Sequence, residues 1–178
     1  SGVEPASGVE PASDALPGAG LEMKAGTALH LALEHLAAGM DEAQAACVLS
    51  RQGLPESVAA RTLSLALAVR SLPALRGAFE PDSGRSEFEL YDPDGRLLRI
   101  DRLCRVGDEL WVIDYKWSVE VQFLSRYSTQ LAGYRHAVAQ LPLTPWFDGG
   151  RSPTAIRTVL VDAAAGTARF DLDLADTM

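Results

Sequence analysis

Two charged motifs on consecutive predicted β-strands could together hold a divalent metal ion. Asp101 lies on the first of these strands, and Asp114 and Lys116 form an Asp-x-Lys pattern on the second. Residues two apart in a strand share a face, so Asp114 and Lys116 should project together, and a tight turn can bring Asp101 beside them. Neighbouring carboxylates repel each other unless a cation such as Mg²⁺ or Mn²⁺ lies between them. A lysine beside that ion could orient an attacking water or stabilise charge that develops on a phosphate.

The same alternation assigns the neighbouring side chains to faces. We expect Arg99, Asp101 and Leu103 to share one face of their strand. Three further side chains are expected on the face opposite Asp114, namely Trp111, Ile113 and Tyr115.

Predicted helices before and after these strands carry further polar candidates. His30 lies on the first helix, and Glu34 follows one turn later, where it could fix the tautomer of the imidazole. Gln130 and Tyr134 are four residues apart on a later helix and should project together, with Tyr127 one turn earlier. Polar groups at these positions could contact a phosphate or a nucleobase.

Each signal also has a purely structural interpretation. An Asp-x-Lys on a strand is more often a solvent-facing pair, and a step such as Asp101-Arg102 is usually surface charge. A lone histidine on an amphipathic helix is more often a surface or core residue than a ligand. The glutamine and tyrosine could equally pack a helix against a sheet. The spacing of the two strand motifs across one tight turn favours a site.

Composition limits the class of protein. The chain has 178 residues, 47% of them hydrophobic and 22% charged, which is typical of a single globular domain. It has no apolar run of the roughly 20 residues needed to cross a bilayer and no secretion signal, so we expect no membrane partner. Two unpaired cysteines, Cys47 and Cys104, favour a reducing, cytoplasmic location. The net charge of -8 argues against a protein that coats nucleic acid nonspecifically, but it is compatible with a metal site.

The chain divides into a terminal segment and one folded domain. Residues 1–20 contain a repeated Ser-Gly-Val-Glu-Pro-Ala and are predicted to be a flexible linker or an added segment, followed by a domain over 21–178. Because the chain lacks an initiator methionine, we expect a fragment of a longer protein. Periodicity predicts helices over residues 24–38, 41–53 and 55–71, followed by strands over 86–91, 96–105 and 110–116. It then predicts a helix over 122–141 and strands over 155–161 and 168–174. This order indicates an α/β domain bordering on α+β, with a mixed sheet.

The order of the motifs resembles the RecB-type nuclease domain of the PD-(D/E)XK superfamily, which often follows UvrD-like helicase modules in bacterial recombination and repair enzymes. The likeness spans about residues 24 to 135. It implies a restriction-endonuclease-like core, in which a mixed central sheet is flanked by helices and preceded by a helical segment. It further implies a Mg²⁺- or Mn²⁺-dependent deoxyribonuclease, expected to be an exonuclease, with DNA and a helicase domain of the same or a partner chain as its partners.

The resemblance also implies a role for each candidate residue. Metal would be bound by His30, Asp101, Asp114 and the carbonyl of Tyr115. Lys116 would be catalytic, together with the two aspartates. Glu87 would be the acidic residue of the preceding strand, with Glu89 as its rival. The residues expected near the substrate are Glu87, Arg99, Tyr127, Gln130 and Tyr134.

Two departures from the family pattern keep other functions open. Arg99 stands where the family commonly has glycine, and it could contact phosphate or crowd the site. Some relatives hold an iron–sulfur cluster with four cysteines, but two cysteines are too few, so we expect none here. One alternative is an inactive module that binds DNA or a helicase. Another is a restriction or phage-type nuclease of the same superfamily.

Overall fold

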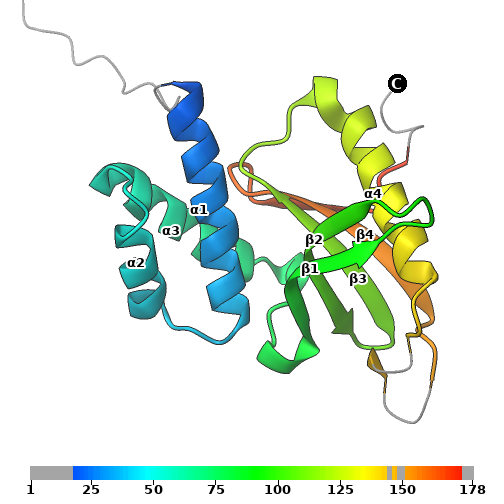
Figure 1. The fold of residues 1–178 in the computed structure, drawn as a ribbon. Coiled ribbons are helices and arrows are strands. Elements are labelled where there is room, and N and C mark those ends of the chain that lie inside the picture. Colours follow the sequence, from blue (N-terminus) through cyan, green and yellow to red (C-terminus); the bar gives the residue numbers. More distant parts are fainter. Residues whose placement is uncertain (1–17, 144–145, 148–150, 174–178) are drawn as a thin grey trace, which may run out of the picture.

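A computed structural model of the chain describes residues 18–143, 146–147 and 151–173. In this part of the chain, three helices lie beside one face of a five-stranded sheet and a fourth covers the other face (Figure 1). The mixed sheet with flanking helices confirms the predicted restriction-endonuclease-like α/β fold.

The first layer is formed by the helices α1 (Ala19–Ala37), α2 (Glu42–Ser50) and α3 (Glu56–Arg70). Gly39, at a φ of 91°, follows the end of α1, where the left-handed backbone suits glycine. Asp41 caps α2 and forms a capping box with Gln44, which supplies partners for two backbone N–H groups. The helix α1 carries His30 towards the sheet.

The sheet has the order β1-β2-β3-β4-β5, which is also the order along the chain. Its strands are β1 (Gly84–Tyr91), β2 (Leu97–Val106), β3 (Glu109–Lys116), β4 (Ala155–Asp162) and β5 (Thr167–Phe170). The strands β3 and β4 are parallel, and the other neighbouring pairs are antiparallel. The helix α4 (Leu124–Ala139) lies in the connection between the two parallel strands, as such connections require. Short 3-10 helices cover Pro73–Leu75, Pro81–Ser83 and Val121–Phe123.

The elements agree with the predicted ones except near their ends. The first helix begins at Ala19, so it includes the last two residues of the predicted linker, while residues 1–17 lie outside the described part. The last strand ends at Phe170, earlier than the predicted 174, and residues 174–178 are also outside that part. The short 3-10 helices before β1 were not predicted, because one turn is too short to show a hydrophobic period.

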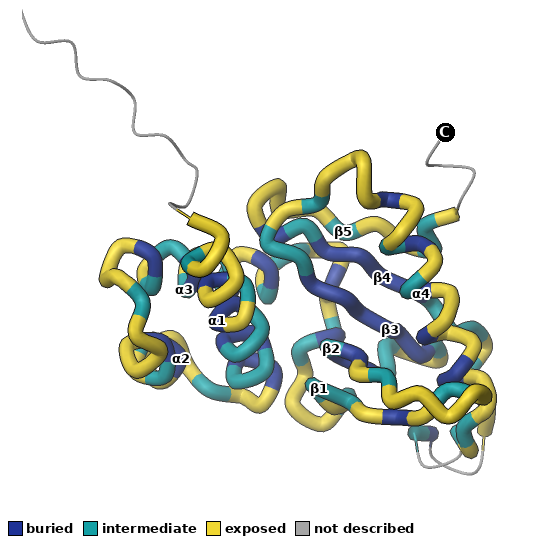
Figure 2. Tube along the Cα trace, turned by 45° about the horizontal axis from the view of Figure 1, so that its top comes forward, coloured by how far each residue is buried: buried dark blue, intermediate teal, exposed yellow. Residues whose placement is uncertain are grey.

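Two hydrophobic clusters hold the layers together. Between α1–α3 and the sheet lie Leu29, Leu33, Ile113 and Tyr115, among other side chains. A second cluster between α4 and the opposite face contains residues such as Leu131. Long buried stretches of the trace run along the central strands β3 and β4 (Figure 2). As predicted, Trp111, Ile113 and Tyr115 face away from the α4 side.

Arg102 on β2 is buried inside the protein, in contrast to the surface position that is usual for a step such as Asp101-Arg102. Only 2% of it is exposed. Its guanidinium donates hydrogen bonds to the carbonyls of Ala78 and Glu80 and to the hydroxyls of Ser83 and Ser86. It therefore joins the segment that precedes β1 to the sheet.

Replacing Arg102 with methionine should destabilise the protein by about 2–3 kcal/mol, because the buried carbonyl of Ala78 and the partly buried carbonyl of Glu80 would lose charge-assisted donors. For a chain of this size, that corresponds to a melting temperature lower by roughly 5–10 °C. Circular dichroism melts of Arg102→Met beside Arg85→Met, which alters an exposed arginine on β1, would measure it. Equal melting temperatures for the two variants would contradict a structural role for Arg102.

Candidate metal centre at the point where two strands part

The two central motifs meet where β2 and β3 separate. Pairing between these strands runs from Val106 and Glu109 to Arg102 and Ile113, and it stops there. Asp101 is the next residue of β2. Its carboxylate accepts a hydrogen bond of 2.7 Å from the backbone N–H of Tyr115. The Asp101 side chain thus binds a backbone N–H of β3 at the place where the next backbone hydrogen bond between β2 and β3 would otherwise form.

The ladder between β1 and β2 is also interrupted at this level. Ser86 pairs with Arg102 and Phe88 with Ile100, but no pair forms between Glu87 and Asp101. Glu87 has a φ of 50°, a left-handed conformation that costs a non-glycine residue of the order of 1 kcal/mol or more. Such strain is often found at functional sites.

The interruption changes which face each residue occupies. Ile100 and Leu103 both pack in the α4 cluster, although regular alternation would place them on opposite faces. Asp101 lies near His30 of α1 and also within electrostatic reach of Asp114, at the place where β2 and β3 part. Regular alternation therefore fails at Ile100, close to the end of the pairing between β2 and β3. That Leu103 shares the face of Asp101 stays a prediction.

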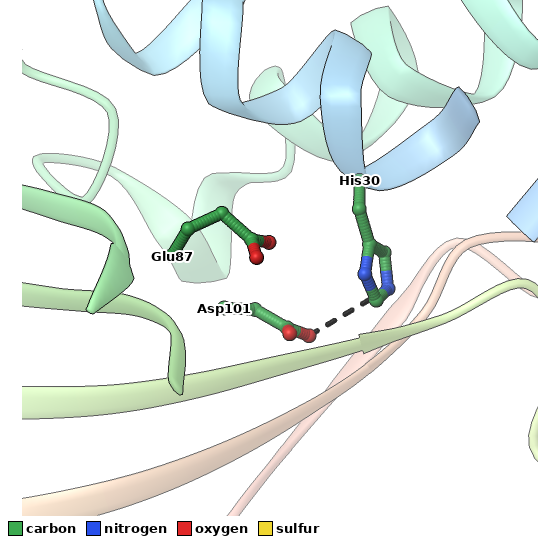
Figure 3. Close-up of side chains that lie close together, drawn as sticks. All are labelled: His30, Glu87 and Asp101. Carbon is green, nitrogen blue, oxygen red and sulfur yellow. Dashed lines mark ion pairs between the residues drawn. The ribbon is translucent and has the colours of Figure 1, made fainter. Parts of the chain in front are cut away.

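Three side chains form a group that could bind a metal ion. His30, Glu87 and Asp101 each offer one ligand atom, and these atoms all lie within 4.8 Å of one another. They come from α1, β1 and β2, and they point into a common space (Figure 3). The Nε2 atom of His30 lies 3.6 Å from Oδ2 of Asp101. It also donates a hydrogen bond of 2.9 Å to the carbonyl of Tyr115.

These distances fit a small divalent ion. Adjacent ligands of an octahedral ion with bonds of about 2.1 Å lie about 3 Å apart. The 2.9 Å separation of His30 Nε2 from the Tyr115 carbonyl matches this value, and the 3.6 Å separation from Asp101 would have to shorten slightly when an ion binds. The ring nitrogen suits Mn²⁺ and other transition ions better than Mg²⁺, whereas the oxygens suit both. To bind an ion, Nε2 would give up the hydrogen that it now donates, and Nδ1 would carry it instead.

Asp114 and Lys116 form an ion pair beside this group. The Nζ atom of Lys116 lies 2.8 Å from Oδ2 of Asp114. The two side chains share a face, as predicted, and Asp114 is only 2% exposed. That oxygen has no hydrogen-bond partner of regular geometry among the described residues, so the ammonium charge is its main compensation. Nζ also lies 5.2 Å from the centre of the Tyr127 ring, within the range of a cation–π contact.

Burial and neighbouring charges together raise the pKa values of two groups in the site. Burial, followed by repulsion from Asp114, raises the pKa of Asp101 to about 6. Burial alone would lower the pKa of Lys116, but the nearby carboxylates, above all Asp114, outweigh it and raise that pKa. The carboxylates are thus held together at a cost in free energy that a divalent cation would relieve. Lys116 remains protonated at neutral pH.

Gln130 and Tyr134 border the site from α4. The amide of Gln130 donates a hydrogen bond of 2.8 Å to the hydroxyl of Tyr134. Burial is the main cause of the raised pKa of Tyr134, and the charges of Asp114 and Asp101 contribute to it. The pair therefore lies within electrostatic reach of the two aspartates.

The structure separates the remaining candidates. Glu34 makes none of the contacts of the His30 ring found among the described residues, and Glu89 is exposed beside Arg99 on the neighbouring strand. Glu87 instead forms an ion pair with Arg99, in which Nε of Arg99 lies 2.9 Å from Oε2 of Glu87. The sequence interpretation placed Glu87 near the substrate, and it missed the proximity to His30. The sequence of a strand does not show where its pairing with a neighbouring strand is interrupted. The position of Glu87 beside His30 therefore could not be predicted.

One comparison with known proteins finds a family for this chain. A family model described as the PD-(D/E)XK nuclease superfamily matches residues 9–169, and members of that superfamily use divalent metal ions. No curated protein matches the chain. Among the helices in the described part, none is long and apolar enough to cross a membrane. The family match covers most of the chain, and the chain therefore belongs to the PD-(D/E)XK nuclease superfamily.

Proposed function

We propose that this domain is a deoxyribonuclease that hydrolyses phosphodiester bonds with Mg²⁺ or Mn²⁺. His30, Asp101 and the Tyr115 carbonyl would hold the ion, and Glu87 is close enough to join them. Asp114 would contribute an oxygen while Lys116 holds the other. The observation that carries the proposal is that this group lies, through Asp101, within electrostatic reach of the Asp114–Lys116 pair, in a chain of this superfamily.

The ion would supply polarisation of the scissile phosphate and a water of lowered pKa. Lys116 has a raised pKa, so it acts as a cation and not as a general base. From its place beside Asp114 it would hold the attacking water and stabilise the charge that develops on the phosphate. The ring of Tyr127 and the charge of Asp114 restrict the position of its ammonium group.

Gln130 and Tyr134 would contact the DNA. Their linked amide and hydroxyl offer donors and acceptors near the two aspartates. A hydroxyl that donates to a phosphate oxygen can position a strand without reading its sequence. Arg99 is exposed next to the proposed ligand Glu87 and would contribute a positive charge on the substrate side.

Incubation with DNA tests the proposal. Linear DNA should be digested with Mg²⁺ or Mn²⁺ and left intact in EDTA. Covalently closed circular DNA should resist, because we propose an exonuclease of the RecB type. Digestion of closed circles would favour a restriction-type activity instead. Intact linear DNA at saturating metal would contradict the proposed activity.

A helicase module, in the same chain or in a partner, is the partner that we propose besides DNA. The net charge of -8 favours weak general affinity for DNA, which such a module could supply. The setting would then be DNA repair or recombination in the cytoplasm. Titration of short duplexes should show weak binding in the absence of metal. Tight metal-free binding would contradict the proposal that a helicase module supplies most of the affinity for DNA.

An inactive module that grips DNA or a helicase is the second candidate, and two contacts favour it. Lys116 is paired with Asp114 and Arg99 with Glu87, so cations of the chain itself already occupy two carboxylates of the site. Calorimetric titration with Mn²⁺ separates the two functions. A nuclease should bind the ion, whereas the absence of measurable binding would favour the inactive module.

A further inference from the structure

Glu87 takes part in two arrangements that compete with each other. It belongs to the group of possible metal ligands with His30 and Asp101. It is also paired with Arg99, whose Nε atom lies 2.9 Å from Oε2 of Glu87. A guanidinium and a divalent ion beside the same carboxylate repel each other, so both cannot be held there at full strength.

The two partners of Glu87 differ in how firmly they are held. The side chain of Arg99 is 65% exposed, whereas that of Glu87 is 29% exposed. The backbone of Arg99 is fixed by its pairing with Glu89, but its long side chain extends into solvent. An ion pair of such exposure is weak, so an arriving divalent ion can displace the guanidinium.

A displaced Arg99 would remain next to the metal. Its guanidinium has five N–H donors in a planar fork that matches the oxygens of a phosphate, and it stays charged at any relevant pH. The anion that reaches a nuclease metal centre is the phosphate of the substrate. The same side chain could therefore neutralise Glu87 before the metal binds and a DNA phosphate afterwards.

We propose that Arg99 is an exchangeable positioning residue, which is paired with Glu87 in the metal-free site and moves to a phosphate of DNA when metal and DNA bind. This role presupposes the nuclease function proposed above. It requires two effects of opposite sign. Removal of Arg99 should strengthen metal binding, because a competing cation is lost, and it should weaken DNA binding, because a phosphate contact is lost.

Calorimetry without DNA measures the first effect. Arg99→Gln should bind Mn²⁺ about twofold to fivefold more tightly than the wild type, as expected for loss of an exposed competing ion pair. Arg99→Lys keeps the charge and should bind Mn²⁺ nearly as the wild type does. The control is Arg51→Gln, which removes an equal charge from the end of α2, a helix that packs on α1 and α3. It should leave the affinity unchanged.

Fluorescence anisotropy with a labelled duplex measures the second effect, in protein that also carries Lys116→Gln so that cleavage of the DNA is slowed by at least about 100-fold. With Mn²⁺ present, Arg99→Gln should weaken DNA binding. The slope of log affinity against log salt should become less steep by about 0.9, which corresponds to one phosphate contact in duplex DNA. Arg99→Lys should retain most of the slope, because it keeps a positive charge at the same place.

The outcomes separate this role from the nuclease function. Wild-type protein that binds no Mn²⁺ would overturn both. If the wild type binds Mn²⁺ and digests DNA but Arg99→Gln binds the ion equally or less tightly, the exchange is wrong and the nuclease function stands. An unchanged salt slope would likewise overturn the exchange alone.

Discussion

Replacement of Lys116 with glutamine is expected to lower the rate of DNA cleavage by at least about 100-fold, while the protein still folds and binds Mn²⁺. Lys116 is the cation paired with Asp114, and its raised pKa keeps it charged. Loss of one preorganised donor to a developing negative charge typically costs about 10²–10³ in rate. Single-turnover digestion of end-labelled linear DNA under saturating metal would measure it.

The chain supplies a matched control for this variant. It contains only two lysines, and the other, Lys24, is exposed on α1. Lys24→Gln makes the same chemical change and should cut DNA at the wild-type rate. Cleavage by Lys116→Gln within a factor of about three of the Lys24→Gln rate would remove Lys116 from the reaction. Mn²⁺ calorimetry on both variants separates a catalytic loss from a loss of the ion.

Asp101→Asn is expected to have two opposite effects, namely loss of metal binding and a gain in metal-free stability. Loss of a ligand should weaken Mn²⁺ binding by at least about tenfold, since even residues that only orient a ligand can cost this much. The gain arises because the carboxylate is buried and faces Asp114, which raises its pKa to about 6. Asparagine keeps an oxygen that can accept the Tyr115 N–H. Without metal at pH 7.5, we expect a gain of about 1 kcal/mol, or roughly 2–4 °C in melting temperature.

The pH dependence of this gain follows from the direction of the shift. An acid whose pKa is higher in the folded than in the unfolded state binds more protons when folded, so it loses stability as pH rises between the two pKa values. For Asp101 these are about 6 and 3.8. The difference between Asp101→Asn and the wild type in EDTA should therefore be full above about pH 6 and shrink as pH falls towards 4. A wild type that is more stable than the variant at pH 7.5 would contradict the buried, repelled carboxylate.

The Asp-x-Lys motif and the helix that carries Gln130 and Tyr134 could be predicted from sequence because their geometry is local. Alternation along a strand places Asp114 with Lys116, and the pitch of a helix places Gln130 with Tyr134. Both contacts are present. The turn between β2 and β3 was also predictable, since Gly107 interrupts a run of strand-forming residues.

The position of Glu87 and the burial of Arg102 could not be predicted, because both depend on contacts between distant segments. The face of Glu87 is set by an interruption of the ladder with β2, where its own φ is 50°. Arg102 is buried by a segment more than 20 residues earlier in the chain, whose carbonyls it binds. Simple alternation assumes regular strands, and it fails where the strands part to make room for the site.

The position of a bound ion tests the central claim most directly. A crystal structure with Mn²⁺, examined by anomalous scattering, should show a peak at bonding distance, roughly 2.0–2.3 Å, from Nε2 of His30 and an oxygen of Asp101. The carbonyl of Tyr115 and carboxylate oxygens of Asp114 or Glu87 should complete its surroundings. A peak elsewhere, or none at a saturating concentration of the ion, would contradict the proposed metal centre.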